Sequence, residues 1–410
     1  MKIGIVGGSI AGCTAAVALS RAGHEVTVLE RSRGGLTGRG AGIGTPLETF
    51  ETLISQDLIG ANTPRFIVSE HPFVSRLDAN DHFGHKALTL PLSMALVNWG
   101  DLWRELRSRV NDSVYVEGCN VSSSQSVGDQ VILSGADGWS DTYDLAFFAD
   151  GYRSNGRRVL FPDLDLSYRG YVLWRGVLEE SRLSDSAPLE TALYRLHYKD
   201  LPGNAVFYLV PGTDGSIDAG NRWVNWACYI PVTEEELSEF LVDRRGDRKT
   251  HSLSPGAMRL EEEERLKKLM SEHLPSYFSE IVADSQDTFV QPIYTVTVPQ
   301  NAVGRIALLG DAGAVAPPFT GSGVFKAMMN AMELVAAIGD ENDPVETLAQ
   351  WSTEQAERGR QLTVLGEQME RAFVWEAPDF SGMAESEARE WWSKSISFPD
   401  EFSYVSDSGD

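Results

Sequence analysis

The chain has 410 residues, and 59 Asp and Glu against 35 Lys and Arg give it a formal charge of −24. A polyanion repels nucleic acids and anionic membrane surfaces, so we expect neither as a partner. Three cysteines are too few for a disulfide framework or a zinc site, and we expect no metal. There is no apolar run of the roughly 18–20 residues that cross a membrane and no signal-peptide pattern, so the expected compartment is the cytoplasm.

The length favours two closely apposed domains, and 42% apolar residues with 23% charged ones are typical of a globular protein. The first 30 residues have the pattern of a strand–turn–helix–strand unit. Residues 2–7 predict a buried parallel strand, residues 13–22 a helix and residues 26–29 a second strand. A glycine-rich turn joins the first strand to the helix.

This unit has the composition of a dinucleotide-binding site. The first glycine of the turn permits a tight bend, a small residue two positions later lets the backbone approach a pyrophosphate, and the third small residue lets helix and strand pack closely. Free N–H groups at the helix start favour phosphate, and the acid that ends the second strand can accept hydrogen bonds from ribose. A βαβ unit that merely packs its helix closely is the alternative. The predicted contacts are Gly7, Ser9, Ile10, Ala11, Gly12, Glu30 and Arg31.

Two later strands, over residues 144–149 and 304–310, each lead into an aspartate. Aspartates at the carboxyl edge of a parallel sheet lie where ligands bind, and they can hydrogen-bond the polyol of a ribityl chain. A second glycine-rich turn then opens a helix over residues 324–338, and its N–H groups suit the N1–C2=O edge of a flavin. Ordinary turn residues are the alternative. The predicted contacts are Asp150, Gly151, Arg157, Gly310, Asp311, Gly321, Ser322 and Gly323.

Between these motifs, residues 168–176, 205–210 and 223–230 alternate apolar and polar side chains or form short apolar runs bounded by turns. This pattern predicts an antiparallel sheet with one buried face. Such a sheet, inserted into a flavin-binding domain, would form a wall over the flavin.

Together the three motifs resemble the single-component (class A) FAD-dependent aromatic hydroxylases. The segments 170–176, 211–216, 225–226 and 289–294 look most like the 2,6-dihydroxypyridine hydroxylase branch. The resemblance implies an α/β FAD-binding Rossmann-type domain, similar to that of glutathione reductase, interleaved with an antiparallel β-sheet substrate domain and followed by C-terminal helices.

On this basis we divide the chain into four parts. They are the first part of the FAD-binding domain at 1–165, with an excursion into the substrate domain at about 65–98; the substrate-binding sheet at 166–284; the second part of the FAD-binding domain at 285–345; and a C-terminal helical segment with an acidic tail at 346–410.

The resemblance adds further cofactor contacts. A loop beside the isoalloxazine corresponds to Arg39, Ala41 and Gly42, and the family position for an arginine at a helix start is Trp99 here. Val121 is a further predicted contact. The dihydroxypyridine branch usually has Arg-Pro-His where this chain has residues 317–319, Pro-Pro-Phe, so a pyridine substrate is in doubt.

The chemistry implied by the resemblance is that of FAD held non-covalently, with NADH or NADPH as a transient electron donor. In that family O₂ adds at flavin C4a, and the hydroperoxide hydroxylates or epoxidises an electron-rich aromatic or heteroaromatic small molecule. No arginine cluster for a 2′-phosphate is evident in this acidic chain, so we expect NADH to serve at least as well as NADPH. A flavin oxidoreductase that does not insert oxygen (a dehydrogenase, reductase or halogenase) and a non-catalytic flavoprotein are the alternatives.

No residue can be assigned as the acid or base. Candidates are His197, Tyr194, Tyr208 and Tyr229 on the expected sheet, together with Pro318, and a structural role for each of the four sheet residues is the alternative. An aromatic wall of Phe207, Tyr208, Trp226 and Phe319 is predicted to bind substrate. We therefore expect a flat, largely apolar substrate rather than a small anionic acid, with Arg175 and Arg195 directed to solvent.

Nine acids and two bases lie in residues 376–410, around Trp391 and Trp392. We interpret this segment as a solvated helix whose aromatic pair packs back on the core. A lid, or a contact in a homodimer, is the alternative.

Overall fold

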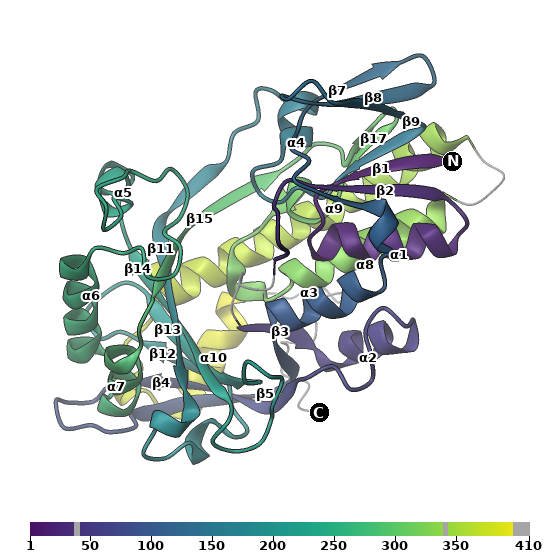
Figure 1. The fold of residues 1–410 in the computed structure, drawn as a ribbon. Coiled ribbons are helices and arrows are strands. Elements are labelled where there is room, and N and C mark those ends of the chain that lie inside the picture. Colours follow the sequence, from purple (N-terminus) through teal and green to yellow (C-terminus); the bar gives the residue numbers. More distant parts are fainter. Residues whose placement is uncertain (37–41, 339–342, 397–410) are drawn as a thin grey trace.

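The computed structural model describes residues 1–36, 42–338 and 343–396. In these ranges the chain forms two domains that lie side by side, one built on a parallel sheet and the other on a large antiparallel sheet (Figure 1). The predicted fold class is confirmed.

The parallel sheet has the strand order β16-β17-β10-β1-β2-β6, in which β16 alone is antiparallel to its neighbour. Side chains of β1 alternate between its two faces, with Ile3 and Ile5 packed toward the helices and Gly4 against the ring of Tyr143. The strands are β1 (Lys2–Val6), β2 (Glu25–Glu30), β6 (Tyr115–Glu117), β10 (Leu145–Phe148), β16 (Ala302–Val303) and β17 (Ile306–Leu308).

Helices cover one face of this sheet and a small sheet covers the other (Figure 1). The helices on the first face are α1 (Ile10–Arg21), α3 (Trp99–Ser108) and α8 (Gly323–Ala337). The small sheet consists of β7 (Val121–Val127), β8 (Gln130–Gly135) and β9 (Ser140–Tyr143), and α4 (Asn155–Leu160) packs beside β7. The carboxyl ends of the parallel strands stay open to a ligand.

The second sheet has the order β18-β15-β11-β14-β13-β12-β4-β5-β3, and within it only β12 and β4 pair in parallel. Its strands are β3 (Gly42–Pro46), β4 (Phe66–Ser75), β5 (His85–Asn98), β11 (Ser167–Glu179), β12 (Tyr194–His197), β13 (Asn204–Val210), β14 (Trp223–Pro231), β15 (Phe289–Thr297) and β18 (Ala314–Val315).

The two faces of the large sheet pack against different partners. On the outer face, Trp174, Phe207 and Trp226 pack in one core with helices α5 (Glu234–Phe240), α6 (Leu260–His273) and α7 (Ser276–Asp284). The inner face packs against the C-terminal helices α9 (Pro344–Glu370) and α10 (Glu385–Ser395) and against the turn at Phe319. Helix α2 (Leu47–Ser55) follows β3 and packs on the core of the parallel-sheet domain.

Strand pairing differs from the sequence-based domain boundaries for three strands. β3, β15 and β18 belong to the large sheet, although the sequence analysis assigned their residues to the FAD-binding parts. The reason is that a strand is assigned to a sheet by its hydrogen-bonded neighbours. β3 pairs with β5 and β15 with β11, which are remote in sequence, and β18 joins the sheet through β15.

The C-terminal aromatic pair lies on the inner core, as expected. Trp392 is 4% exposed and stacks on Phe373 with ring centroids 6.1 Å apart. The last part of the acidic tail, from residue 397, lies outside the described residues. Among the helices in the described ranges, none is long and apolar enough to cross a membrane.

Candidate active site

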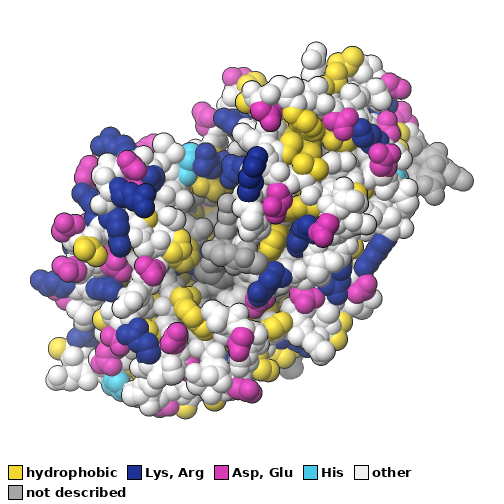
Figure 2. Space-filling view, in the orientation of Figure 1, with side chains coloured by type: hydrophobic (Ala, Val, Ile, Leu, Met, Phe, Trp, Pro, Cys, Tyr) yellow, Lys and Arg dark blue, Asp and Glu magenta, His cyan; other side chains and the backbone are white. Residues whose placement is uncertain are grey.

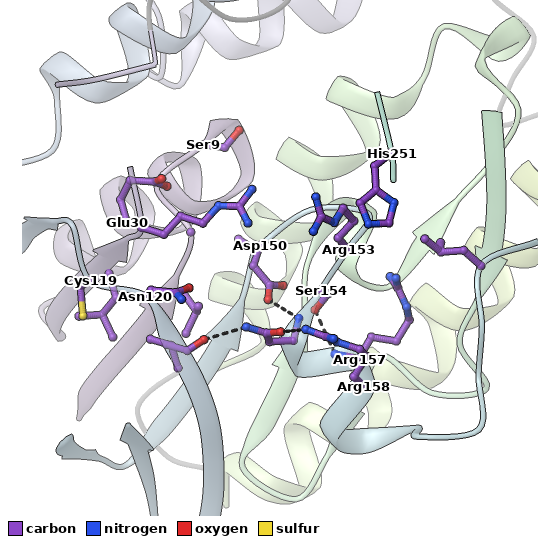
Figure 3. A pocket seen from close by; sticks show the side chains of 18 of the residues that line it. Ser9, Glu30, Cys119, Asn120, Asp150, Arg153, Ser154, Arg157, Arg158 and His251 are labelled. Atoms are coloured by element: carbon purple, nitrogen blue, oxygen red, sulfur yellow. Dashed lines mark hydrogen bonds between the residues drawn. The ribbon is translucent and has the colours of Figure 1, made fainter. Parts of the chain in front are cut away.

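A cavity of about 670 Å³ opens at the carboxyl ends of β1, β2 and β10. Figure 3 shows it from close by, with Glu30 on one side and His251 on the other. Seven of the predicted cofactor contacts line it, namely Gly7, Ser9, Glu30, Arg31, Val121, Asp150 and Arg157. Because it lies at the glycine-rich turn, we call it the nucleotide cavity.

The turn between β1 and α1 has the close packing that the glycine pattern predicts. Gly7 has φ +101°, a conformation that side-chain-bearing residues rarely adopt, and a Cβ on Gly12 would lie 1.9 Å from the Gly7 carbonyl oxygen. Neither position can carry a side chain without moving the backbone. The helix start therefore stays within reach of a pyrophosphate.

Two acids face this cavity, and they differ in how completely their oxygens are hydrogen-bonded. Glu30 accepts hydrogen bonds from the backbone N–H groups of Gly8 and Ser32, both at 2.8 Å. Asp150 accepts one from Asn155 at 2.7 Å through Oδ2, whereas its Oδ1 is buried without a hydrogen bond to the described residues. Burial raises the pKa of Asp150. A donor from a bound ligand would satisfy this oxygen.

Basic side chains gather around the same cavity, although the chain as a whole is strongly acidic. Figure 2 shows Lys and Arg side chains and a histidine at the upper rim of the hollow between the two domains. Arg31 and Arg153 form no ion pair within the described ranges, and Arg153 lies next to His251 in Figure 3. The lining members are Arg31, Arg153, Arg157, Arg158 and His251. Arginines therefore gather at the predicted FAD nucleotide site in spite of the overall acidity, whereas the expectation that NADH serves at least as well as NADPH stays a prediction.

A second cavity, of about 340 Å³, lies between the start of α8 and the inner face of the large sheet. We call it the ring cavity. Nine predicted residues line it, namely Gly42, Tyr208, Tyr229, Asp311, Pro318, Phe319, Gly321, Ser322 and Gly323. Arg157 links the two cavities, because it lines the first and donates to the carbonyl of Asp311, which lines the second, at 3.2 Å.

Three side chains of the large sheet hold the backbone of Gly42 at the edge of the ring cavity. Asn225 accepts from the Gly42 N–H at 2.9 Å, while the Tyr208 hydroxyl and Arg175 donate to its carbonyl at 2.7 and 2.9 Å. A Cβ on Gly42 would lie within 3 Å of both Asn225 and Tyr208. The predicted contacts Arg39 and Ala41, just before this point, lie outside the described residues.

Aromatic rings form one wall of the ring cavity. Phe319 stacks on Tyr229 with centroids 4.5 Å apart and planes inclined by 27°. Burial raises the pKa of Tyr229, and the charges of Arg195 and Arg175 lower it. Tyr208 lies on the same side, and burial raises its pKa to about 12. Both phenols are therefore neutral at physiological pH.

The ring cavity is also lined by more positive than negative groups. Arg175, Arg195 and Lys326 face a single acid, Asp311, and the Lys326 ammonium lies 3.7 Å from that carboxylate. The expectation that Arg175 and Arg195 point to solvent is wrong. Both come from strands whose inner face carries every second residue, and that face is the cavity wall.

Two predicted substrate contacts lie on the other face of the sheet. Phe207 packs on Phe278 and Trp226 on Trp174, and neither Phe207 nor Trp226 lines the ring cavity. Their sequence neighbours Tyr208 and Ala227 line it instead, because successive strand residues point to opposite faces. The prediction for these two residues is corrected accordingly. Tyr194, one of the acid–base candidates, shares the outer face.

His197 is on the inner face but under the C-terminal helices. Its ring lies 4.3 Å from that of Phe380 and does not line the ring cavity. Burial lowers its pKa well below the ordinary value, and neither ring nitrogen has a hydrogen bond within the described part of the chain. His197 is thus a buried residue among aromatic side chains and does not line the ring cavity.

The remaining predicted contacts stand near the cavities without lining them. Trp99 begins α3 and packs on the core of the parallel-sheet domain. Those that form the turns and helix start beside the lining are Ile10, Ala11, Gly12, Gly151 and Gly310.

Sequence reasoning missed several lining residues. In the nucleotide cavity His251 and Tyr294 come from outside the motifs, and in the ring cavity His71, Met369 and Trp392 do so. A period-two pattern could have placed His71 on the inner face of a strand. Nothing in the local sequence indicates that α9 and α10 close the cavity.

The residues present fit FAD. The turn at Gly7 and Gly12 leaves no room for side chains, and the arginines surround a space that suits phosphates. Oδ1 of Asp150 is a buried acceptor without a hydrogen bond to the described residues, and a ligand hydroxyl could donate to it. At the ring cavity, residues 321–323 belong to the lining and α8 begins at Gly323, so that the free N–H groups at the helix start point to the same space.

Comparisons with known proteins agree with this fit. A model described as FAD dependent oxidoreductase matches residues 2–121, and one described as FAD binding domain-like matches residues 168–295. The 2,6-dihydroxypyridine 3-monooxygenase of Paenarthrobacter nicotinovorans is 28% identical over 368 residues, which cover 87% of this chain and 88% of that protein.

Solved structures show the same fold. The 2,6-dihydroxypyridine-3-hydroxylase from Arthrobacter nicotinovorans superimposes with a TM-score of 0.83 at 24% identity, covering 93% of this chain and 96% of that one. HpxO of Klebsiella pneumoniae, complexed with FAD and uric acid, gives a TM-score of 0.73 at 19% identity, covering 96% and 92%.

These findings define an FAD-dependent monooxygenase that uses NAD(P)H as electron donor. The predicted resemblance to the single-component aromatic hydroxylases, and to their dihydroxypyridine branch, is confirmed.

Proposed function

We propose that this chain hydroxylates an electron-rich aromatic or heteroaromatic small molecule in the ring cavity. Overall, one oxygen atom of O₂ enters the ring and the other leaves as water, while NAD(P)H is oxidised and one proton is consumed. The observation that carries the proposal is the stacked pair of Phe319 and Tyr229 beside the start of α8, since it places an aromatic wall next to the flavin-binding turn.

The protein's part in this reaction is to hold the ring, exclude water and handle protons. The chemistry supplied by bound FAD is the activation of O₂ with electrons from NAD(P)H. Apolar side chains from β5, β13 and α9 surround the ring space and keep water out. They are Leu92, Met94, Val206, Leu362 and Met369.

Among the acid–base candidates, Tyr229 is the one whose placement suits proton transfer. It lines the cavity, and the charges of Arg195 and Arg175 act on its hydroxyl. That hydroxyl makes no hydrogen bond to the described residues and can therefore bond a ligand. The hydroxyl of Tyr208 is already used at Gly42. Pro318 lines the cavity but has no ionisable group, so it contributes only to the shape of the cavity. We therefore assign the proton-transfer role to Tyr229.

A screen of ring compounds tests the proposal. Purified holoenzyme is mixed with NADH or NADPH in air, and each compound is scored for stimulated NAD(P)H oxidation and for a product heavier by one oxygen atom. We expect at least one ring compound to give both. If stimulated oxidation yields only hydrogen peroxide for every compound, the oxidoreductase that does not insert oxygen is the better assignment.

Assembly and compartment stay predictions. A homodimer would be detected as a doubled mass in solution, and the cytoplasmic location by fractionation of the source cell.

A further inference from the structure

Arg195 is a buried cation whose guanidinium charge is not balanced by a neighbouring acid of the described chain. Its residue is 5% exposed, and no carboxylate of the described chain lies within ion-pair distance. By contrast, Arg222, 4% exposed, forms ion pairs with Glu180 and Glu190. Arg157, 3% exposed, forms no ion pair either, but the charges of Asp150 and Asp311 act on it. A charge removed from water is costly unless an opposite charge compensates for it.

The groups that do touch Arg195 are neutral. Its Nη1 donates to Asn204 at 2.8 Å, and its Nε donates to Nε2 of His71 at 3.5 Å. The other ring nitrogen of His71 lies 2.7 Å from the Leu193 carbonyl, so it carries the proton and leaves Nε2 as the acceptor. Burial and the Arg195 charge together lower the pKa of His71 to about 3. No hydrogen bond within the described ranges uses Nη2 of Arg195.

Two aromatic rings of the described chain also contact the charge. The guanidinium carbon lies 4.3 Å from the ring centroid of Phe373 and 5.5 Å from that of Phe319. Cation–π contacts of this kind are worth less than the desolvation of an ion. They orient the guanidinium but leave its charge uncompensated. Burial accordingly lowers the pKa of Arg195 to about 10, so that it remains charged at physiological pH.

The other charged groups of the ring cavity do not balance the charge of Arg195 either. Among the described residues of the lining Asp311 is the single acid, and Lys326 lies beside it as its ion-pair partner. Arg175, on β11 of the same wall, donates to the Gly42 carbonyl. In a chain with 24 more acids than bases, this cavity thus has an excess of positive charge.

We propose that Arg195 is the anchor for an oxyanion carried by the substrate ring, so that the substrate class is an aromatic or heteroaromatic ring with a carboxylate or an ionised hydroxyl. The inference rests on the proposed hydroxylase function and deepens it. It also replaces our expectation of an uncharged substrate. The ring lies against the wall of Phe319 and Tyr229, and the oxyanion accepts from Nη2, the arm of Arg195 that the protein leaves unused.

Binding to the oxidised holoenzyme, without NAD(P)H, tests the anchor separately from catalysis. Two matched pairs of probes are titrated while the flavin absorbance is followed: benzoate against benzamide, and 4-nitrophenolate against 4-nitroanisole. We expect the anion of at least one pair to bind more tightly than its neutral partner by about 10- to 100-fold, the range of a hydrogen bond to a charged group. The pair that shows the preference tells whether carboxylate or ionised hydroxyl is the natural anion.

The variants Arg195→Gln and Arg195→Lys assign the preference to this residue. We expect the glutamine variant to bind the anion and its neutral partner with equal affinity, and the lysine variant to keep part of the preference. Arg245→Gln is the matched control, because it removes one exposed arginine from a loop that lines neither cavity. FAD content and melting temperature are recorded for each protein.

If neither anion is preferred by the wild-type protein, the anchor proposal is wrong whether or not the variants fold. It is also wrong if the glutamine variant keeps the full preference. In either case the hydroxylase proposal is unaffected, since that one fails only if no ring compound is oxygenated.

Discussion

The nucleotide cavity and the ring cavity are built in different ways. The first is formed largely by the turns that follow β1, β2 and β10, and its close approach depends on positions such as Gly7 and Gly12 where a side chain cannot fit. The second is walled by side chains from β4, β5, β11, β12, β13, β14, α8, α9 and α10, which meet only in the folded chain. A site made from backbone turns has a local sequence pattern, whereas a site made from remote side chains has none.

The two cavities also differ in how their charged groups are paired. At the nucleotide cavity the protein leaves two atoms without a hydrogen bond to the described residues, Oδ1 of Asp150 and Nε of Arg157, and these belong to groups of opposite charge that act on each other. At the ring cavity it leaves an entire charge, that of Arg195, without an ionic partner.

The largest effect is expected where the nucleotide cavity depends on the absence of a side chain. Gly12→Val would place a Cβ at 1.9 Å from the Gly7 carbonyl oxygen, and two further methyl groups beyond it. We expect purified protein without yellow colour, measured as the ratio of flavin absorbance to protein absorbance. Gly382→Ala is the control, since a Cβ there meets nothing within 4 Å. A Gly12→Val protein with normal FAD content would contradict the backbone origin of this site.

The next effect concerns Asp311, at the border of the two cavities. Asp311→Ala should weaken FAD binding by about 1.5–3 kcal/mol, because it removes charge-assisted hydrogen bonds to the ribityl chain. The dissociation constant is measured by the recovery of flavin fluorescence on dilution. Asp129→Ala, an exposed acid on the small sheet, should leave it unchanged. Equal affinities for both variants would remove Asp311 from the cofactor site.

A third prediction tests whether His197, on the inner face of the large sheet, is a core residue rather than a catalytic one. Burial lowers the pKa of His197 and of His71, so the unfolded chain binds protons that the folded chain does not. The free energy of unfolding should therefore fall as pH decreases below 6.5, by about 1.4 kcal/mol per pH unit for each such histidine, down to the folded-state pKa.

His197→Phe should lower this slope by one histidine's share and raise stability at acid pH, because a phenyl ring suits its aromatic surroundings and needs no hydrogen bond. Chemical denaturation at several pH values measures the slope. Turnover at neutral pH should stay close to that of the wild type. A loss of turnover with unchanged FAD content would return His197 to the list of catalytic residues.

The smallest effect is expected for Tyr208→Phe. Its hydroxyl holds the Gly42 carbonyl at 2.7 Å, and Arg175 holds the same oxygen, so the loss should be about 0.5–1.5 kcal/mol, or roughly tenfold at most in kcat/KM. A residue that transfers the proton would instead be worth about 100-fold or more. Steady-state kinetics with the best ring compound from the screen distinguishes these values, and a 100-fold loss would make Tyr208 the acid or base.

Much of the fold could be predicted from the sequence, because it rests on local patterns. The strand–turn–helix unit at the N-terminus, the two aspartates after β10 and β17, and the long strands β11, β13 and β14 all have clear periodicity or turn chemistry. The assignment of β3 and β15 to the large sheet could not be predicted, since strand pairing depends on partners far away in sequence.

The ring cavity was predicted only in part for the same reason. A strand pattern tells that Phe207 and Tyr208 face opposite sides, but it does not tell which side faces the flavin. Helices α6 and α7 pack on the face of the sheet that carries Phe207. Because of this packing, the aromatic residues on that face are in the core and those on the opposite face line the site. Arg195 was assigned to solvent because an arginine is rarely buried without an acid.

The central claim is that O₂ provides the oxygen inserted into an anionic ring at this site. The direct test is single-turnover hydroxylation of the best anionic substrate under isotopically heavy O₂ in ordinary water, with the product analysed by mass spectrometry. We predict one heavy oxygen atom in each product molecule. A product whose added oxygen is light, and therefore derived from water, or NAD(P)H oxidation that forms hydrogen peroxide alone, would contradict the account.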